Sequence, residues 1–308
     1  MNSTSFREVA SGLRFPEGPI WCRDGSLLAV ELEAGVLTRI RSGGRTERIA
    51  HLGGSPNGAA IGPDGACYIC NSGGFAWHED AEGLRMTGQG SRYTGGRIER
   101  VDLSSGSVTR LYDRTDHGEL RGPNDLVFDR NGGFWFTDSG KTRPRDMDRG
   151  GVYYALPDGS SVRQVIYPLM TPNGVALSRD EDKLYVAETP TGRLWEFDVT
   201  APGVVDLRPW PSPNGGRLLA GLAGYQLLDS MAVDSEGSIC VATLMNGGIT
   251  VVPRSGAAAR HIPLPDRYTT NLCWGGPDLQ TAYVTLGQSG RLVAMDWHCP
   301  GQPLNYSR

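Results

Sequence analysis

The chain has 308 residues, 39% of them hydrophobic, and a formal net charge of −4 with both signs interspersed along the sequence. No apolar run reaches the roughly 18 residues that a membrane span requires, and no basic stripe is present, so we expect neither a membrane nor a nucleic-acid partner. The start, MNSTSFREVASGL, has no basic stretch followed by an apolar one, which predicts a cytoplasmic protein without a signal peptide.

One pattern recurs six times along the chain: a turn, a short apolar strand, a polar turn and a second β-rich strand. Its first strands are PEGPIW from Pro16, PNGAAI from Pro56, PNDLVF from Pro123, PNGVAL from Pro172, LLDSMAV from Leu227 and TTNLCW from Thr269. The 43 glycines and 20 prolines of the chain agree with many short strands joined by many turns.

A glycine opens a third strand after each repeat, and a fourth follows it. The glycines are Gly35, Gly96, Gly151, Gly192, Gly248 and Gly290. Six four-stranded units at this spacing predict an all-β fold, a six-bladed β-propeller with four antiparallel strands per blade, as a single domain over residues 1–308. The last unit lacks an outer strand, which we expect the N-terminal segment 6–13 to supply, closing the ring.

The six cysteines are expected to stay reduced, mostly as small buried side chains in or beside strands. Cys67 and Cys70 have C-x-x-C spacing, but residues three apart on a strand point to opposite faces. A redox or zinc role for this pair is therefore disfavoured.

The longest connection within a repeat covers about residues 72–95, SGGFAWHEDAEGLRMTGQGSRYTG. It links the second and third strands of its unit, and so emerges on the face where the first strands begin. Long ordered loops in compact domains are often functional. We therefore predict a lid over that mouth of the channel.

The residue that opens each first strand carries a side-chain oxygen in all six repeats. These residues are Glu17, Asn57, Asn124, Asn173, Asp229 and Asn271. Rotational repeats would bring them together around one axis. Two carboxylates and an amide suit a divalent cation, with Ca²⁺ most favoured and Zn²⁺, Mn²⁺ or Mg²⁺ possible. For Asn57 and Asn271, capping of their own backbone turns is an equally good explanation.

Four motifs, PEGPIW, RGPNDLVFD, TPNGVALS and LDSMAVDSEG, resemble in order and spacing the regucalcin, gluconolactonase and luciferin-regenerating-enzyme family of six-bladed propellers. The resemblance spans nearly the whole chain. It implies a divalent metal held by Glu17, Asn173 and Asp229, and a substrate contact from Asn124. The Asp229–Ser230 pair is similar to the bacterial drug-responsive lactonase branch, which implies that Ser230 joins the metal shell.

The chain departs from this family at one position. Sugar lactonases of the family often carry an arginine two residues before the substrate asparagine, where Gly122 stands here, while Arg121 lies one residue earlier. Further substrate contacts are predicted from Arg121, Asn57 and Asn271. Trp77, His78 and Tyr225 near the mouth are also predicted to contact the substrate, and the aromatic side chains of Trp77, Tyr93 and Tyr225 favour a less polar or aromatic lactone.

These observations predict a metal-dependent lactonase that opens a small-molecule cyclic ester to a hydroxy acid, acting as a monomer or small homo-oligomer. Asp229 is the expected general base, or serves only as a ligand. Two alternatives stay open: a phosphotriesterase or fluorophosphatase at the same site, and a non-catalytic binding platform. Asp138–Ser139–Gly140 could hold a second ion, whereas Gly140–Lys141–Thr142 does not complete a phosphate-binding loop.

Overall fold

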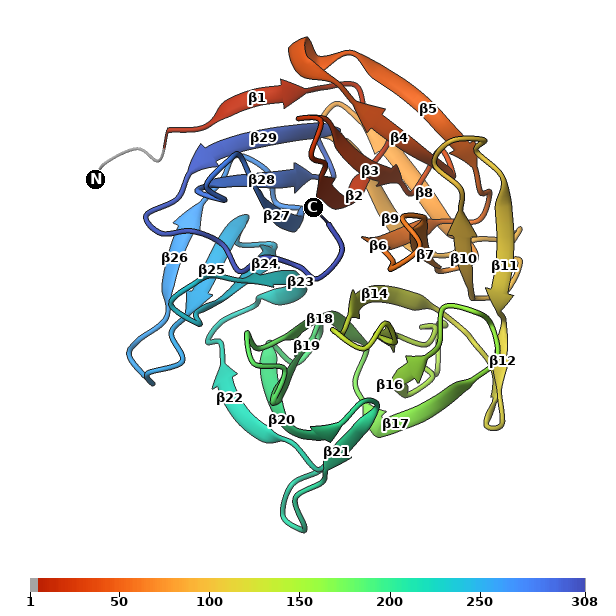
Figure 1. Ribbon diagram of the computed structural model, residues 1–308, viewed down its shortest axis with the longest axis vertical. Coiled ribbons are helices and arrows are strands. Elements are labelled where there is room, and N and C mark those ends of the chain that lie inside the picture. Colours follow the sequence, from red (N-terminus) through yellow and green to blue (C-terminus); the bar gives the residue numbers. More distant parts are fainter. Residues whose placement is uncertain (1–4, 308) are drawn as a thin grey trace.

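The computed structural model describes residues 5–307 and is built almost entirely from β-strands. Its sheets radiate from a central axis as the blades of a six-bladed propeller, each with antiparallel strands (Figure 1). Within this range the only helical element is a short 3₁₀ turn at Ser42–Gly44. Among the same residues, no helix is long and apolar enough to cross a membrane.

The innermost strand of each blade is the first strand of a sequence repeat. These strands are β2 (Pro16–Trp21), β6 (Pro56–Ile61), β14 (Pro123–Phe128), β18 (Pro172–Leu177), β23 (Leu227–Val233) and β27 (Thr269–Gly275). Each contacts the next inner strand in order, and β27 contacts β2, so the ring is closed around a channel.

Three further strands extend most blades outward, in the order in which they follow along the chain. Blade 1 continues with β3 (Leu27–Glu31), β4 (Val36–Ile40) and β5 (Thr46–His51). Blade 2 continues with β7 (Cys67–Asn71), β10 (Arg97–Val101) and β11 (Val108–Tyr112). Blade 3 continues with β15 (Phe134–Asp138), β16 (Gly150–Ala155) and β17 (Val162–Leu169). Blade 4 continues with β19 (Lys183–Glu188) and β20 (Arg193–Ala201). Blade 5 continues with β24 (Ile239–Leu244), β25 (Gly248–Val252) and β26 (Arg260–Pro263). Blade 6 continues with β28 (Thr281–Leu286) and β29 (Arg291–Asp296).

The N-terminal strand completes blade 6, as the sequence predicts. Strand β1 (Arg7–Ala10) pairs antiparallel with β29, placing Arg7 opposite Ala294 and Glu8 opposite Val293. In Figure 1 this strand lies at the rim of the ring, while the C-terminus lies near its centre. Strand β1 therefore closes the ring at its outer edge, whereas the C-terminal tail lies near the central axis.

Blade 4 departs from the four-strand pattern. Its long third strand β20 pairs with two separate segments, β21 (Val204–Asp206) and β22 (Arg217–Gly221), so its sheet has five strands. A second unpredicted element is a small hairpin between blades 2 and 3, formed by β12 (Arg114–Thr115) and β13 (Gly118–Glu119).

The core lies between blades, because each strand presents alternate side chains to its two neighbouring blades. Strand β7 shows this directly. Cys67 and Ile69 join an apolar cluster with residues of blade 1, whereas Tyr68 and Cys70 join one with residues of blade 3. The two cysteines thus lie on opposite faces, as the spacing predicts, and no disulfide is formed by any cysteine of residues 5–307.

The predicted lid segment forms a two-stranded hairpin, β8 (Phe75–Asp80) and β9 (Gly83–Gln89), called the lid hairpin below. It reaches from blade 2 past blade 1 to blade 6, and part of it lines the upper end of the channel. The N–H of Leu84 donates to the carbonyl of Gln288 in blade 6 (3.0 Å), and the Arg14 guanidinium donates to both carboxylate oxygens of Glu79 (2.7 and 2.9 Å). Both contacts anchor the hairpin over neighbouring blades.

Candidate active site

The six strand-opening residues of the sequence repeats, called the ring residues below, lie at one end of the channel. Beside each of them the pairing between inner and second strand shifts register. The shifts fall at Glu17/Ile20, Pro56/Ala59, Pro123/Leu126, Pro172/Val175, Leu228/Met231 and Thr269/Asn271. A local bulge frees a residue from the regular alternation of the ladder, and so re-aims its side chain. Repetition of the bulge places all six ring residues at one level.

Glycines allow the inner strands to approach closely at this level. A Cβ atom on Gly58 would lie 2.6 Å from the carbonyl oxygen of Asn124, and one on Gly174 would lie 2.7 Å from that of Asp229. Gly18 faces the backbone of Asn57 and Ala59 in the same way. The absence of these side chains brings neighbouring ring residues together.

A cavity of about 200 Å³ opens above the ring, on the side of the lid hairpin, and is called the upper cavity below. Five ring residues line it: Glu17, Asn57, Asn124, Asn173 and Asp229. The sixth, Asn271, lines instead a second cavity of about 120 Å³ on the opposite side of the ring, the lower cavity. The predicted ring therefore forms the floor of one cavity and part of the roof of another.

Glu17 is fully buried and only partly satisfied. Its Oε2 accepts hydrogen bonds from the Nδ2 of Asn271 (2.7 Å) and the N–H of Gly18, whereas Oε1 has no hydrogen-bond partner among the described residues. Burial, together with the negative charges of Asp229 and Asp125, raises the pKa of Glu17 well above its usual value. An unpartnered carboxylate oxygen at this depth marks a place for a positive group.

Asp229 and Asn173 complete the predicted ligand set across the ring. Burial raises the pKa of Asp229, and the nearby Asp125 raises it further, while the Asn173 amide opposes the shift. Ser230 is fully buried, and its hydroxyl lies 3.5 Å from the Oδ1 of Asn173. The side-chain oxygens of these residues thus converge on one part of the ring.

Asp125 is a third carboxylate at this level, which the sequence analysis missed. It follows ring residue Asn124, at the repeat position where Gly18, Gly58 and Gly174 stand in other blades. Its Oδ1 accepts the N–H of Leu126 (2.9 Å), and burial raises the pKa of Asp125 to about 7. The signal was present in the sequence as a charged residue where three other repeats have glycine.

The chemistry of these groups fits a divalent cation. Glu17 and Asp229 are buried carboxylates that repel each other and Asp125, and an oxygen of Glu17 lacks a partner. All contributing atoms are oxygens of carboxylate, amide or hydroxyl groups, which are the ligands that Ca²⁺ accepts. A cation at the ring would satisfy the free oxygen and offset the repulsion.

Two ring asparagines differ in how they are engaged. The Oδ1 of Asn124 is buried without a hydrogen-bond partner among residues 5–307, so its amide is available to a ligand in the upper cavity. The Oδ1 of Asn271 accepts the N–H of Leu272 (2.7 Å), the backbone capping considered for this residue. Because its Nδ2 also holds Glu17, Asn271 orients a carboxylate and does not line the upper cavity.

The two substrate contacts predicted on the lid hairpin, Trp77 and His78, do not line the upper cavity. Phe75 and Met86 line the upper cavity, whereas Trp77 packs on Phe15 with ring centroids 5.1 Å apart and anchors the hairpin. The side chain of His78 is 52% exposed and lies 3.3 Å from the Asp80 carboxylate. A register shift between Ala76 and Trp77, together with the alternation of the strand, decides which side chains face inward.

Two other predicted substrate contacts lie outside the upper cavity. The Arg121 side chain is about half exposed and forms an ion pair with Glu119 (3.3 Å). Tyr225 is 77% exposed, in the turn before β23. Both lie in turns just before an inner strand, and neither lines the upper cavity.

Lys141 is a further cavity residue that the sequence analysis did not find. It was considered only as part of a phosphate-loop motif, yet its buried side chain lines the upper cavity from the loop after β15. The phosphate-loop motif requires a glycine where Trp135 stands. The available signal was the length of the loop between the second and third strands of this blade, on the face where the first strands begin.

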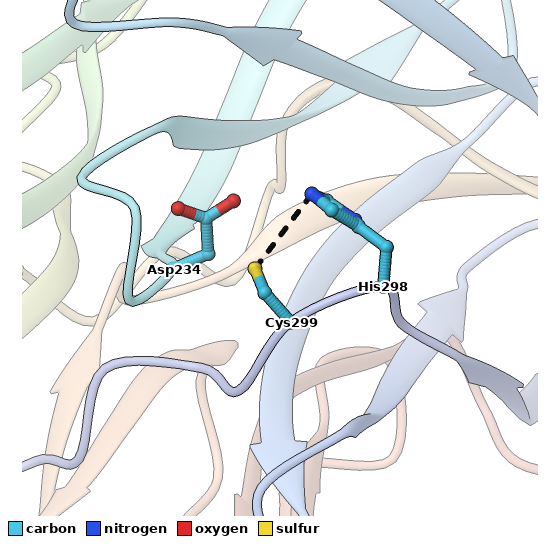
Figure 2. A group of neighbouring side chains, drawn as sticks. All are labelled: Asp234, His298 and Cys299. Atoms are coloured by element: carbon cyan, nitrogen blue, oxygen red, sulfur yellow. Dashed lines mark hydrogen bonds between the residues drawn. The ribbon is translucent and has the colours of Figure 1, made fainter.

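A separate group of possible ligands lies away from the ring. Figure 2 shows Asp234, His298 and Cys299 pointing toward one another, with the Cys299 sulfur 3.7 Å from the Nε2 of His298. The Oδ1 of Asp234 accepts two backbone N–H groups of its own turn, and Arg260 lies 3.3 Å from the Nδ1 of His298. These contacts already engage the group in the structure of blades 5 and 6.

The sequence of this chain is similar to a known protein family and to several of its members. The model of a family described as SMP-30/Gluconolactonase/LRE-like region matches residues 15–288. The lactonase drp35 of Staphylococcus saprophyticus is 31% identical over 253 residues, which cover 82% of this chain and 70% of that protein. The gluconolactonase of Zymomonas mobilis is 27% identical over 317 residues, covering 92% of this chain and 79% of the relative.

Solved structures agree on the fold. A calcium-binding protein, regucalcin, from Agrobacterium tumefaciens superposes with a TM-score of 0.72 at 18% identity, covering 97% of this chain and 95% of that one. At this identity the likeness concerns the propeller architecture alone.

Proposed function

Since the chain belongs to the SMP-30/gluconolactonase/LRE-like family, we propose that it is a divalent-metal-dependent lactonase that opens a small cyclic ester to a hydroxy acid at the upper cavity. Homologues named lactonase and gluconolactonase support lactone hydrolysis at the level of the family, and with it a small-molecule substrate. The single observation that carries the proposal is the ring of buried oxygen side chains that floors an enclosed cavity.

Glu17, Asn173 and Asp229 would hold the cation, with the Ser230 hydroxyl beside them. A calcium-binding structural relative and the all-oxygen donor set favour Ca²⁺. When bound, a divalent cation polarises a carbonyl group and lowers the pKa of a water molecule in its shell.

The protein's own groups would then orient the ester and move the proton. Asn124 would orient the ester from the cavity wall by donating from its Nδ2, while its unpartnered Oδ1 can only accept, for example from a substrate hydroxyl or a water molecule. A carboxylate oxygen of Asp229 accepts the proton of the attacking water as the new C–O bond forms at the carbonyl carbon. When the ring C–O bond breaks, the same carboxyl returns the proton to the departing alkoxide. One lactone and one water molecule thus give one hydroxy acid.

The lid hairpin would exclude bulk water from this reaction. Phe75 and Met86 place apolar surface over the cavity, and the contacts of Trp77 and Glu79 with blade 1 hold the hairpin in place. A drier site strengthens every electrostatic interaction with developing charge.

The proposal is tested by proton release on a panel of sugar, aliphatic and aromatic lactones. Wild type is assayed after chelation and after separate return of Ca²⁺, Mg²⁺, Mn²⁺ and Zn²⁺, beside Asp229→Ala. We expect turnover that vanishes with chelator, returns with one metal and is absent in the variant.

Asn305→Ala serves as the matched control, because Asn305 lies at the other end of the channel and bonds the Phe128 carbonyl. It should keep wild-type turnover. A folded, metal-loaded protein that opens no lactone would overturn the proposal. Activity on phosphotriesters under those conditions would assign the same site to the alternative hydrolase.

A further inference from the structure

Lys141 is a buried ammonium group in the wall of the upper cavity. It is 5% exposed, and its Nζ has no hydrogen-bond partner among the described residues. It sits in the loop between β15 and β16, beside Phe75 at the start of the lid hairpin. Burying a charged amine without a partner is costly, so the fold keeps this group at the expense of stability.

The surfaces around the ammonium are largely apolar or backbone. Its Nζ lies 4.4 Å from the ring centroid of Phe75 and 5.1 Å from that of Tyr93. The backbone of Gly122 also lies beside the ammonium, since a Cβ atom built there would be 3.5 Å from Nζ. Aromatic faces attract a cation but accept no ordinary hydrogen bond from it, and three N–H donors remain free.

Two carboxylates lie near Lys141, and both are engaged elsewhere. Asp138 accepts the backbone N–H groups of Arg121, Gly122 and Gly140 at 2.7 to 2.8 Å. Asp148 accepts two hydrogen bonds from the Arg143 guanidinium (2.8 and 3.1 Å). Burial lowers the pKa of Lys141 to about 8, and these two charges oppose the shift, so the amine is mostly protonated at pH 7.

The ammonium is set apart from the reacting end of the cavity. Its Nζ makes no hydrogen bond to Glu17, Asp229 or Asp125, and the charges that act on it are those of Asp138 and Asp148. A general acid for the leaving alkoxide would have to sit beside Asp229. The position of Lys141 suits a group at the far end of the substrate instead.

We propose that Lys141 binds a carboxylate substituent of the lactone, and that this protein therefore selects lactones that carry a carboxylate. The inference rests on the proposed lactonase function and names its substrate class. A cavity of about 200 Å³ suits one small ring with one substituent. The ester would face the ring residues, and the substituent would accept hydrogen bonds from the ammonium under Phe75 and Tyr93.

The test compares two lactones that differ only in charge: 5-oxotetrahydrofuran-2-carboxylate and its neutral carboxamide. For wild type, kcat/KM should be about ten- to a hundredfold higher for the carboxylate, the range typical of a charge-assisted hydrogen bond. Lys141→Met keeps the apolar stem over Phe75. It should remove this preference by lowering only the carboxylate value, and Lys141→Arg should restore part of it.

Arg92→Met is the matched control for a general loss of positive charge, since Arg92 is exposed on the segment that follows the lid hairpin. It should leave the preference between the two lactones unchanged. Equal turnover of both lactones by wild type would overturn the inference, as would an equal loss on both lactones in Lys141→Met.

A binding measurement separates failure of the inference from failure of the proposed function. Tetrahydrofuran-2-carboxylate has the ring and the charge but no ester, and is titrated calorimetrically into wild type and Lys141→Met. Binding that weakens about tenfold or more in the variant supports the subsite even if no lactone is opened. Equal affinity for both proteins overturns the subsite even if lactones are opened.

Discussion

The two ends of the central channel are built from the same six strands but serve different purposes. At the upper end, buried carboxylates, an unpartnered amide oxygen and an unpaired ammonium surround a cavity. At the lower end, the C-terminal tail closes the channel with satisfied contacts. The N–H of Gln302 donates to the Val233 carbonyl (2.9 Å), and the Nδ2 of Asn305 donates to the Phe128 carbonyl (3.0 Å).

This difference between the two channel ends shows where the buried polar atoms without hydrogen-bond partners gather. Buried polar atoms are normally paired, so a cluster of exceptions at one end of a symmetric ring indicates a binding site. The lower cavity is lined mainly by apolar side chains, and the side-chain oxygens of Asp125 and Asn271 that border it accept backbone N–H groups of Leu126 and Leu272. We therefore expect substitutions at the upper end to affect function, and those at the lower end to affect stability.

The largest expected effect is at the upper end. Glu17→Gln keeps the shape of the side chain and its hydrogen bond from Asn271, but removes a ligand charge. Cation affinity should fall more than about a hundredfold, since even outer-shell changes cost ten- to a hundredfold. Calorimetric titration with Ca²⁺ measures the loss.

The melting temperature of the chelated Glu17→Gln protein should not fall, because the substitution removes a buried charge. A marked drop in melting temperature without metal would show that Glu17 supports the fold and would break the comparison between the two ends.

The lower end is tested by ending the chain after Gly301. This removes Gln302 and Asn305 with their hydrogen bonds and exposes the apolar lining of the lower cavity. We expect a loss of about 2–4 kcal/mol in the free energy of unfolding, measured by urea denaturation. Catalysis on the best lactone of the panel should stay within about twofold at temperatures below the transition.

Asn271 joins the two ends, since its amide holds Glu17 while its side chain lines the lower cavity. Asn271→Leu should weaken cation binding about ten- to a hundredfold without removing a ligand. Luminescence of bound Tb³⁺, titrated against Ca²⁺, measures this. An unchanged affinity would mean that Glu17 is oriented by the Gly18 N–H and the strand bulge alone.

The smallest expected effect is that of Lys141→Met, which should raise the free energy of unfolding, whereas the tail truncation should lower it. Burial lowers the pKa of Lys141 to about 8, below the usual lysine value near 10.4, so the ammonium opposes folding at neutral pH. Lys141→Met should therefore stabilise the protein by about 1–2 kcal/mol at pH 7. The gain should fade as the pH rises from about 8 to above 10, where lysine is neutral in both states. Urea midpoints at pH 7 and pH 10 provide the measurement, and a destabilised variant at pH 7 would contradict it.

The propeller and its ring were predictable because both depend on repetition. The six first strands share a pattern, and the closure by the N-terminal segment follows from the incomplete last unit. Five of the six ring residues line the upper cavity, and the register shift recurs beside all six. Asn271 lies on the other side of the ring, a difference that no repeat pattern reveals.

The lid and the cavity wall were harder to predict, because they belong to single loops. Phe75 and not Trp77 lines the cavity as a result of one register shift in a hairpin. Lys141 reaches the cavity through the path of the β15–β16 loop, which is longer than the corresponding turn in blades 1, 4, 5 and 6. Arg121 was chosen for its charge and proximity in sequence, but a turn directs its side chain to solvent.

The shared sixth blade has a consequence for how the protein is made. Strand β1 is synthesised before its partner β29, with five blades made between them. An unpaired strand edge invites wrong pairing, so β1 must stay unpaired through the synthesis of those five blades. This strand is short, and Arg7 and Glu8 on it are exposed in the folded protein. Two charged side chains in four residues keep the strand compatible with water until β29 is made.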